Sequence, residues 1–158
     1  MVRIRLAGPD DLPMLDAGLR ALSADLGHDH RAGLAELHLA GFGAHPAFLG
    51  LLAEDAGALA GVALCSPLFS TTRGAAGVHV SDLWVAAGWR GQGLGVRLLA
   101  AARDEGAARW GAGFLRLGVA PGNAHARAFY DRLGFTPAMD ETMMTLTGAP
   151  LAALEGSP

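Results

Sequence analysis

The sequence predicts a single α/β domain whose mixed β-sheet is covered by helices, and three observations support this. The chain has 158 residues, a length that suits one domain with one core. Hydrophobic residues make up 51% of the chain and charged residues 17%, a composition that favours a folded core over disorder. Apolar residues recur with the period of strands in some segments and of helices in others, in the order β, α, α, β, β, β, α, β, α, β.

The N-terminal part of the chain predicts one strand and two helices. Residues 2–6 alternate as a short strand, and Pro9-Asp10-Asp11 then supplies a turn and residues typical of a helix start. The first helix is indicated by leucines at helical spacing, namely Leu12, Leu15, Leu19, Leu22 and Leu26. A second, weaker helical pattern covers residues 31–40.

The middle of the chain predicts three strands. Residues 48–53 and 59–65 are apolar runs of strand length separated by a short polar turn, as is typical of antiparallel neighbours. Residues 70–77 are polar and contain glycine, so we expect a loop there. Residues 78–86 then predict the fourth strand of the chain.

The C-terminal part begins with a glycine-rich turn at residues 88–95. Residues 94–111 follow with apolar positions at helical spacing and end among glycines. Residues 114–119 predict a further strand, and residues 123–133 predict a helix. Residues 141–146 predict the last strand, which completes the mixed sheet.

Charge and composition exclude several classes of function. The formal net charge is -3 and the pI is near 6.0, so no basic field attracts nucleic acid. All 12 basic residues are arginines, which excludes a P-loop lysine and Schiff-base chemistry. No apolar stretch approaches the roughly 20 residues of a membrane span, and the N-terminal sequence lacks a signal-peptide layout. We therefore expect a cytoplasmic protein without nucleic-acid or membrane partners.

The cysteine and histidine content predicts no metal site. Cys65 is the only cysteine, so it forms no internal disulfide and no cysteine-based zinc site. It lies in an apolar run, where we expect a buried and inert thiol. The histidines show no metal-ligand spacing with nearby carboxylates.

A candidate ligand-binding loop joins the fourth predicted strand to the next helix, with the sequence Arg90-Gly91-Gln92-Gly93-Leu94-Gly95. Glycines let the backbone turn tightly and approach a ligand, while free N–H groups and the helix dipole attract an anion. A phosphate or diphosphate suits this loop, although similar turns also arise for packing alone. A dinucleotide fingerprint fits poorly, because the spacing is G-x-G-x-G and Arg116 stands where an acidic residue is expected.

Two segments resemble motifs of the GNAT superfamily of N-acetyltransferases. Residues 85–95, Val-Ala-Ala-Gly-Trp-Arg-Gly-Gln-Gly-Leu-Gly, resemble that family's strand end and Arg/Gln-x-x-Gly-x-Gly/Ala loop. Residues 115–119 resemble its fifth strand, and residues 123–135 resemble its Asn-x-x-Ala-x-x-Phe-Tyr-x-x-x-Gly-Phe closing motif. Ala87 departs from the pattern, because the family usually has proline there. The resemblance covers residues 78–135.

The resemblance implies a GNAT-like fold with splayed fourth and fifth strands, and acetyl-CoA as cosubstrate without a metal. Backbone N–H groups from Arg90 to Gly95 would then hold the diphosphate of coenzyme A. Main-chain groups of Leu83 and Val85 would pair with the pantetheine arm like an added strand. Asn123 would contact the arm or the diphosphate in addition to capping its helix.

Acetyl transfer to an amine needs a base for the amine and an acid for the departing thiolate. Tyr130, the only tyrosine, falls where the family places that acid beside the cofactor; the alternative is packing against Phe129. His79 falls where arylalkylamine N-acetyltransferases have a strand histidine, and histidine titrates near pH 6.5; the alternative is a half-buried structural histidine. Ser81 and Asp82 are candidate substrate-binding residues; the alternative for Asp82 is a structural role. Ser81 shares the face of His79, and Asp82 points the other way unless a bulge intervenes.

The resemblance thus implies an enzyme formed by one domain, residues 1–158, that acetylates the primary amine of a small molecule by direct transfer in a ternary complex. The alternatives are acetylation of protein N-termini or side chains, and a non-catalytic domain that binds acetyl-CoA for regulation. After the first helix, a polar cluster either selects a cationic amine or forms a solvated loop; it consists of Asp25, His28, Asp29 and His30. A homodimer through the late strands is compatible with family habit.

Overall fold

The computed structural model describes residues 1–139 and 141–154. The chain forms two compact units, residues 1–118 and the residues from 119 onward. The first unit contains a β-sheet and the helices that cover it, and the second contains two helices and no strand in its described part. No helix in the described residues is long and apolar enough to cross a membrane.

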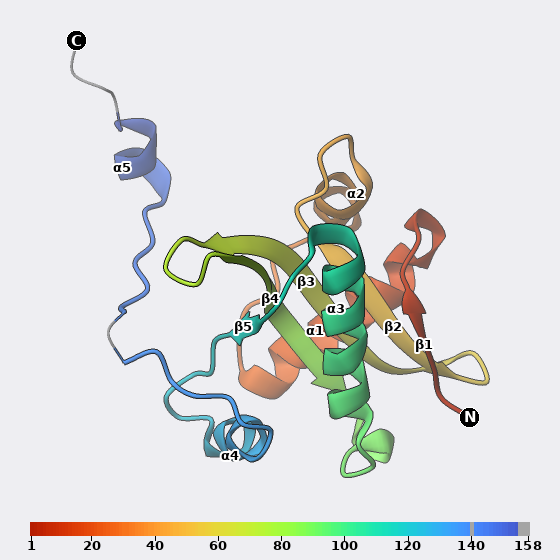
Figure 1. The fold of residues 1–158 in the computed structure, drawn as a ribbon. Coiled ribbons are helices and arrows are strands. Elements are labelled where there is room, and N and C mark those ends of the chain that lie inside the picture. The colour runs from red at the N-terminus through yellow and green to blue at the C-terminus, as the bar shows by residue number, and fades with distance from the viewer. Residues whose placement is uncertain (140, 155–158) are drawn as a thin grey trace. The chain divides into compact units, whose positions relative to one another are not determined.

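A five-stranded sheet forms the centre of the first unit (Figure 1). Its strands are β1 (Arg3–Leu6), β2 (Leu49–Asp55), β3 (Ala58–Ser70), β4 (Ala75–Val85) and β5 (Leu115–Leu117). They lie in the order β1-β2-β3-β4-β5, and neighbours are antiparallel except for the parallel pair β4 and β5. The predicted mixed, mostly antiparallel sheet is therefore confirmed.

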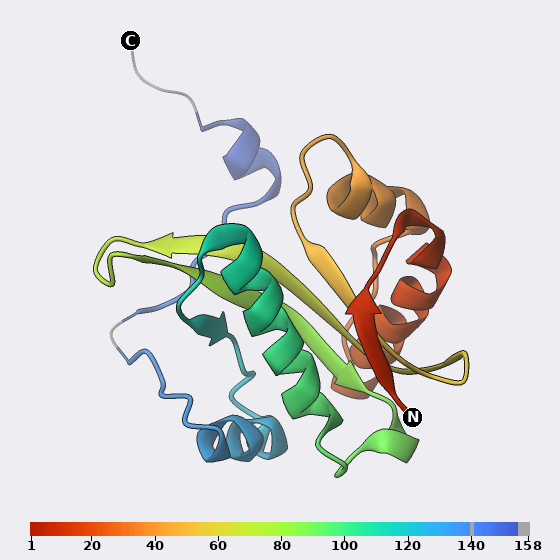
Figure 2. The same ribbon diagram turned by 45° about the vertical axis from the view of Figure 1, so that its right-hand side comes forward.

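Helices cover both faces of this sheet (Figures 1 and 2). The helical elements of the first unit are η1 (Pro9–Asp11), α1 (Leu12–Leu26), α2 (Leu34–Phe42), η2 (Ala87–Trp89) and α3 (Leu94–Trp110). Two adjacent residues of β3 show the division, because neighbours along a strand face opposite sides. Val62 is buried in the core cluster with the leucines of α1 and α2, while Gly61 lies against Leu98 of α3.

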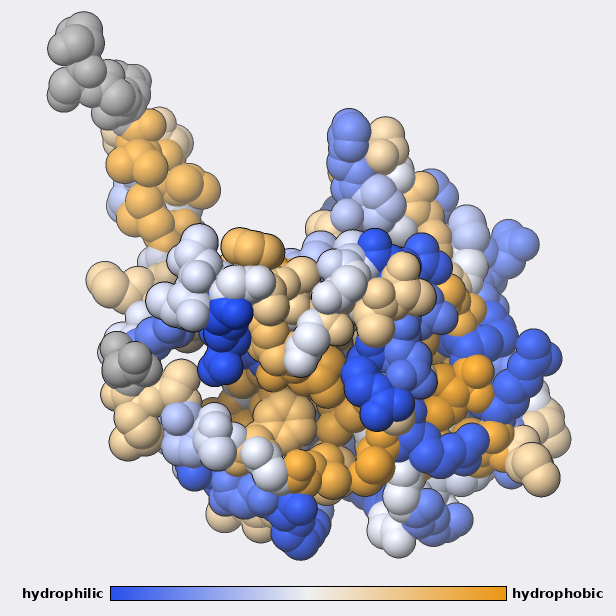
Figure 3. Space-filling model, viewed as in Figure 1, coloured by the Kyte–Doolittle hydropathy of each residue, from blue (hydrophilic) through white to orange (hydrophobic). Residues whose placement is uncertain are grey.

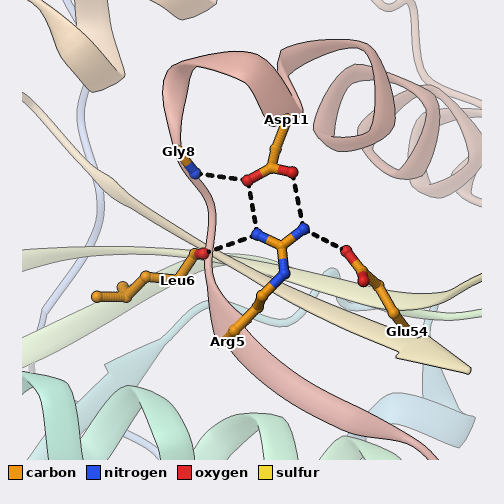
Figure 4. Close-up of polar contacts among 5 residues, drawn as sticks. All are labelled: Arg5, Leu6, Gly8, Asp11 and Glu54. Carbon is orange, nitrogen blue, oxygen red and sulfur yellow. Dashed lines mark hydrogen bonds and ion pairs between the residues drawn. The ribbon is translucent and has the colours of Figure 1, made fainter. Parts of the chain in front are cut away.

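Arg5 fastens the N-terminal corner of the sheet (Figure 4). Its guanidinium donates to both carboxylate oxygens of Asp11 at 2.6 and 2.7 Å, and to Glu54 of β2 at 2.5 Å. It also donates to the carbonyl of Leu6, while the Gly8 N–H donates to Asp11. These hydrogen bonds lower the pKa of Asp11 to about 2. The cluster joins β1, η1 and β2. The carboxylates of Asp11 and Glu54 both accept hydrogen bonds from Arg5.

The hairpin between β3 and β4 is longer than the sequence predicts. Residues 70–77 were expected to form a loop, yet the ladder continues through the pairs Leu68↔Gly77, Phe69↔Ala76 and Ser70↔Ala75. Only residues 71–74 form the turn. Pairing with a neighbouring strand outweighs the low strand propensity of glycine and serine here.

The second unit contains helices α4 (Ala124–Arg132) and α5 (Gly148–Ala152). The predicted last strand at residues 141–146 is wrong, because these residues have no regular secondary structure. Met143 and Met144 are 91% and 88% exposed, so they bury no apolar face, and a strand without a neighbour to pair with is not stable alone. Hydrophobic residues around α5 also face solvent (Figure 3).

Candidate functional site

The glycine loop lies between η2 and α3, at the position that the sequence predicts. Gly91 and Gly93 have φ angles of 73° and 77°, in the left-handed region that residues with a side chain rarely adopt. A Cβ at either position would meet nothing within 4 Å, so the requirement for glycine is conformational rather than steric crowding. The two glycines let the chain turn twice immediately before α3.

The start of α3 presents unpaired backbone amides. The Arg97 N–H donates to the Gly93 carbonyl at 3.1 Å and begins the ladder of helical hydrogen bonds. By helix geometry, the amides of Leu94, Gly95 and Val96 precede that ladder and have no acceptor within the helix. Gly93 is the N-cap residue and has no side chain to cap them. The positive end of a 17-residue helix is thus left open to an anion such as a diphosphate.

Arg90 is held in place by an acidic residue from the end of α1. Its Nε donates to the Val85 carbonyl at 2.8 Å, and its Nη2 donates to Asp25 at 2.5 Å. The same Asp25 oxygen accepts the indole N–H of Trp84 at 3.0 Å. Asp25 therefore braces the end of β4 and the first residue of the glycine loop. This role is not predictable from a local sequence pattern, because 65 positions separate Asp25 from Arg90.

The second half of β4 has an open edge. β5 pairs with β4 only at three positions, Val78 to Val80, while β4 continues to Val85. On the other edge, the Ala86 N–H donates to the Ala60 carbonyl, which fixes the hydrogen-bonded pairs of the β3–β4 ladder. Because such pairs alternate, the N–H and C=O groups of Leu83 and Val85 point away from β3. They point to the side of β4 on which β5 pairs only as far as Val80.

A β-bulge interrupts β4 at Ser81. Leu64 pairs with Asp82, and the next residue of β3, Cys65, pairs with Val80. Ser81 is therefore the extra residue on β4. A bulge reverses the alternation of side chains beyond it, which is the condition that the sequence analysis left open for Asp82.

The bulge brings three candidate residues to one face of β4. Asp82 pairs with Leu64, which belongs to the core cluster under α1 and α2, and His79 pairs with Ser66, two residues further along the same face of β3. His79 and Asp82 thus share the α1 side of the sheet. The Ser81 hydroxyl donates to Asp82 at 2.7 Å. His79, Ser81 and Asp82 therefore lie together on one face of β4.

The polar cluster after α1 does not gather at one point. His30 lies against Ser23 of α1, with Nδ1 at 3.2 Å from Oγ, and its Nε2 is 3.3 Å from the Asp16 carboxylate. The side chains of His30 and Asp16 are only 15% and 14% exposed, so these contacts fasten the loop to α1. Asp29 is exposed and pairs with Arg31. Asp25 alone reaches β4 and the glycine loop.

Asn123 caps the start of α4 in the second unit, and Tyr130 lies within this helix. The Asn123 Oδ1 accepts the N–H of Ala126 at 3.0 Å, which confirms the predicted helix cap. Tyr130 packs edge-on against Phe129 and Phe135, with ring centres 5.0 and 5.4 Å away. Burial raises the pKa of the Tyr130 hydroxyl, so it stays protonated at neutral pH.

Cys65 is buried in the sheet, away from solvent. Cys65 is 1% exposed in β3, and burial raises the pKa of its thiol to about 11. The thiol therefore remains protonated and unreactive at neutral pH, as expected from its apolar surroundings. Within residues 1–139 and 141–154, no three His, Cys, Asp or Glu side chains are grouped to hold a metal ion.

The sequence as a whole matches a known family. Residues 18–135 match the model of the acetyltransferase (GNAT) family, so the chain belongs to that family. Its members are generally acetyl-CoA-dependent acetyltransferases. No curated protein matches the sequence with significance.

Solved structures with the same fold include three of different description. An integron cassette protein from the mobile metagenome of V. cholerae is 19% identical, with a TM-score of 0.76 over 96% of this chain and 95% of that one. The aminoglycoside N-acetyltransferase AAC(6')-Iy, solved with CoA, is 19% identical, with a TM-score of 0.75 over 94% and 95%. A ribosomal-protein-alanine N-acetyltransferase from Brucella melitensis biovar Abortus 2308 is 17% identical, with a TM-score of 0.71 over 92% and 99%. At these identities the likeness shows the common fold alone.

Proposed function

We propose that the protein is an acetyl-CoA-dependent N-acetyltransferase that acetylates the primary amine of a small molecule by direct transfer in a ternary complex. In this proposal one catalytic domain spans residues 1–158. The observation that carries it is the combination of open amides at the start of α3 with the open edge of β4. An anion-binding helix terminus beside an unpaired strand edge suits a ligand with a diphosphate and an amide-bearing arm.

The chain's main-chain groups would bind coenzyme A in two places. The amides from Arg90 to Gly95 would hold its diphosphate, since Gly91 and Gly93 turn the backbone so that α3 begins with exposed N–H groups. Leu83 and Val85 would pair with the pantetheine arm as a strand pairs with a sheet edge. Asn123 would add a contact from the start of α4. The bound cosubstrate supplies the acetyl group as a thioester.

Two side chains would handle the protons of the transfer. The amine must lose a proton to attack the thioester carbon, and His79 would accept it directly or through water. As the new N–C bond forms and the C–S bond breaks, the Tyr130 hydroxyl would protonate the departing thiolate. A tyrosine hydroxyl carries its proton at neutral pH, so the proton is available when the thiolate forms. Ser81 and Asp82 would orient the amine on the face that they share with His79.

Solved structures with this fold are named for more than one kind of acceptor. AAC(6')-Iy is named for transfer to aminoglycosides, whereas the Brucella protein is named for transfer to a ribosomal-protein alanine. A protein acceptor thus stays an alternative, as does a non-catalytic domain that only binds acetyl-CoA. A homodimer also stays a prediction.

Release of free CoA across a panel of amines and peptides tests the proposal. We expect acetyl-CoA-dependent release with at least one small amine, and little with peptides. Tyr130→Phe should lower kcat about 100-fold while the acetyl-CoA Kd changes less than about twofold, since only the proton donor is lost. Phe129→Leu is the matched control for the packing of this helix and should retain most of the kcat. Unchanged turnover in Tyr130→Phe would remove this tyrosine from the mechanism, and binding without turnover on any acceptor would favour the regulatory alternative.

A further inference from the structure

Arg116 lies beside His79 on the α1 side of the sheet. The two residues are partners in the parallel register of β4 and β5, so their side chains share a face. Phe114, two residues before Arg116, faces the same way and covers Gly77, where an added Cβ would lie 2.5 Å from the ring. The proposed base thus has an aromatic ring and an arginine as neighbours in the sheet.

A second arginine reaches the same ring from the β3–β4 turn. The guanidinium of Arg73 lies 5.2 Å from the centre of the Phe114 ring, and that of Arg116 lies 5.8 Å from it. Both distances suit a cation–π contact, and both arginines are exposed. Both guanidinium groups therefore contact one aromatic ring. We call Arg73, Phe114 and Arg116 the arginine clamp.

In the part of the chain that the structure describes, the cations of the arginine clamp have no acidic partner. Most arginines of the first unit, such as Arg5 and Arg90, form an ion pair with a carboxylate. Neither Arg73 nor Arg116 forms one among the residues that the structure describes. Two like charges repel each other, and an anion between or beside them would relieve this repulsion. Guanidinium groups bind carboxylates with paired hydrogen bonds and bind them in a defined orientation.

We infer that the acceptor carries a carboxylate close to its reactive amine, and that Arg116 and Arg73 bind this carboxylate beside His79. The inference rests on the proposed function, and it narrows the substrate class to amino acids and similar amines. Positive charges beside the amine also favour its neutral, attacking form over its cationic form. The same charges disfavour polycationic acceptors such as aminoglycosides, because they repel each additional ammonium group.

Matched acceptors test the inference in the intact protein. Each amino acid is compared with the amine that lacks only the carboxylate, such as lysine with cadaverine and phenylalanine with phenylethylamine. The wild type should favour the carboxylate-bearing member by about tenfold or more in kcat/KM, a difference of about 1.4 kcal/mol. Arg116→Gln and Arg73→Gln should remove this preference through KM, with little effect on the carboxylate-free member. Arg109→Gln, which removes an equally charged residue from α3, should preserve the preference.

Binding of the acetylated product separates this inference from the proposed function. Calorimetry with CoA present compares an N-acetylated amino acid with the N-acetylated amine that lacks the carboxylate. Selective binding of the former by the wild type and not by Arg116→Gln supports the arginine clamp even if no amine is turned over. Equal binding of both, or wild-type binding retained in Arg116→Gln and Arg73→Gln, overturns the inference. A wild-type preference for a carboxylate-free amine, or for one with a phosphate in place of the carboxylate, overturns it too.

Discussion

Two corners of the first unit each use an arginine in a different way. At the N-terminal corner, Arg5 binds Asp11, Glu54 and a backbone carbonyl, and the corner closes on itself (Figure 4). At the end of β4, Arg90 binds Asp25 and a backbone carbonyl, yet the amides that follow it at the start of α3 have no helical acceptor. The arginine contacts therefore satisfy the polar groups of the first corner, whereas at the second corner they hold the loop and leave the amides of α3 without an acceptor. A ligand gains most where such amides are held in place but unpaired.

The largest effect on acetyl-CoA affinity should come from a carboxylate introduced at the unpaired amides of α3. Gly93→Glu places a bulky negative side chain at the amides of α3, so we expect the acetyl-CoA Kd to rise at least about 100-fold, or about 2.7 kcal/mol. Gly57→Glu is the matched control, because Gly57 also has a left-handed φ, of 83°, and open space around its Cβ. Both variants carry the same backbone strain and charge, and isothermal calorimetry should show normal affinity only for Gly57→Glu. Normal affinity in both would place the diphosphate elsewhere.

The closed corner should instead respond in stability. Arg5→Gln leaves the carboxylates of Asp11 and Glu54 without their cation at sites that are about one-fifth exposed, so we expect the free energy of unfolding to fall by about 2 kcal/mol. Urea denaturation measures this difference, and the acetyl-CoA Kd should stay within about twofold. Arg116→Gln removes an arginine with no ion pair in the described structure and should change the stability by less than about 0.5 kcal/mol. Equal losses in both variants would contradict the distinction between the two arginines.

The pH dependence of the closed corner follows from Asp11. Its pKa is lowered from 3.8 to about 2, so its stabilisation is complete above pH 3.8 and is lost as the pH falls through 2. Asp11→Asn should therefore cost about 1.5 kcal/mol at neutral pH, and the gap to the wild type should narrow steadily towards pH 2. Denaturant unfolding at several pH values measures the gap. A gap that keeps its full size at pH 2 would show that Asp11 acts through packing rather than through charge.

Features that depend on neighbouring residues in the chain could be predicted from the sequence. The glycines before α3 and the cap at Asn123 each act within a few positions, through backbone conformation or a local hydrogen bond. The leucine spacing of α1 likewise gave the buried positions Leu12, Leu15 and Leu19, whereas Leu26 at the helix end is 40% exposed. A pattern of a few residues contains the whole physical cause in these cases.

Features that depend on distant partners could not be predicted. The bulge at Ser81 follows from the register of β3 against β4, and only that register places Asp82 on the face of His79. Arg116 reaches the same face through parallel pairing across the long connection that contains α3. A one-residue shift in register would reverse each of these placements, so composition and spacing in one segment cannot decide them.

The smallest effect on acetyl-CoA affinity should come from weakening the Asp25–Arg90 ion pair without changing the amides of α3. Asp25→Asn keeps an oxygen for the Trp84 indole but removes the charge that holds Arg90, in a pair whose side chains are 53% and 46% exposed. An exposed ion pair contributes at most about 1 kcal/mol, so stability should barely change. The loop would nevertheless sample more conformations, and we expect the acetyl-CoA Kd to rise about threefold to fivefold. The difference in acetyl-CoA Kd between Asp25→Asn and the wild type should shrink at high salt, because salt already weakens the wild-type ion pair.

Asp104→Asn, which removes an exposed partner of Arg103 further along α3, is the matched control and should leave the Kd unchanged. If Asp25→Asn binds acetyl-CoA as tightly as the wild type, Gly91 and Gly93 alone determine the conformation of the loop. The Asp25–Arg90 pair then has no part in holding it.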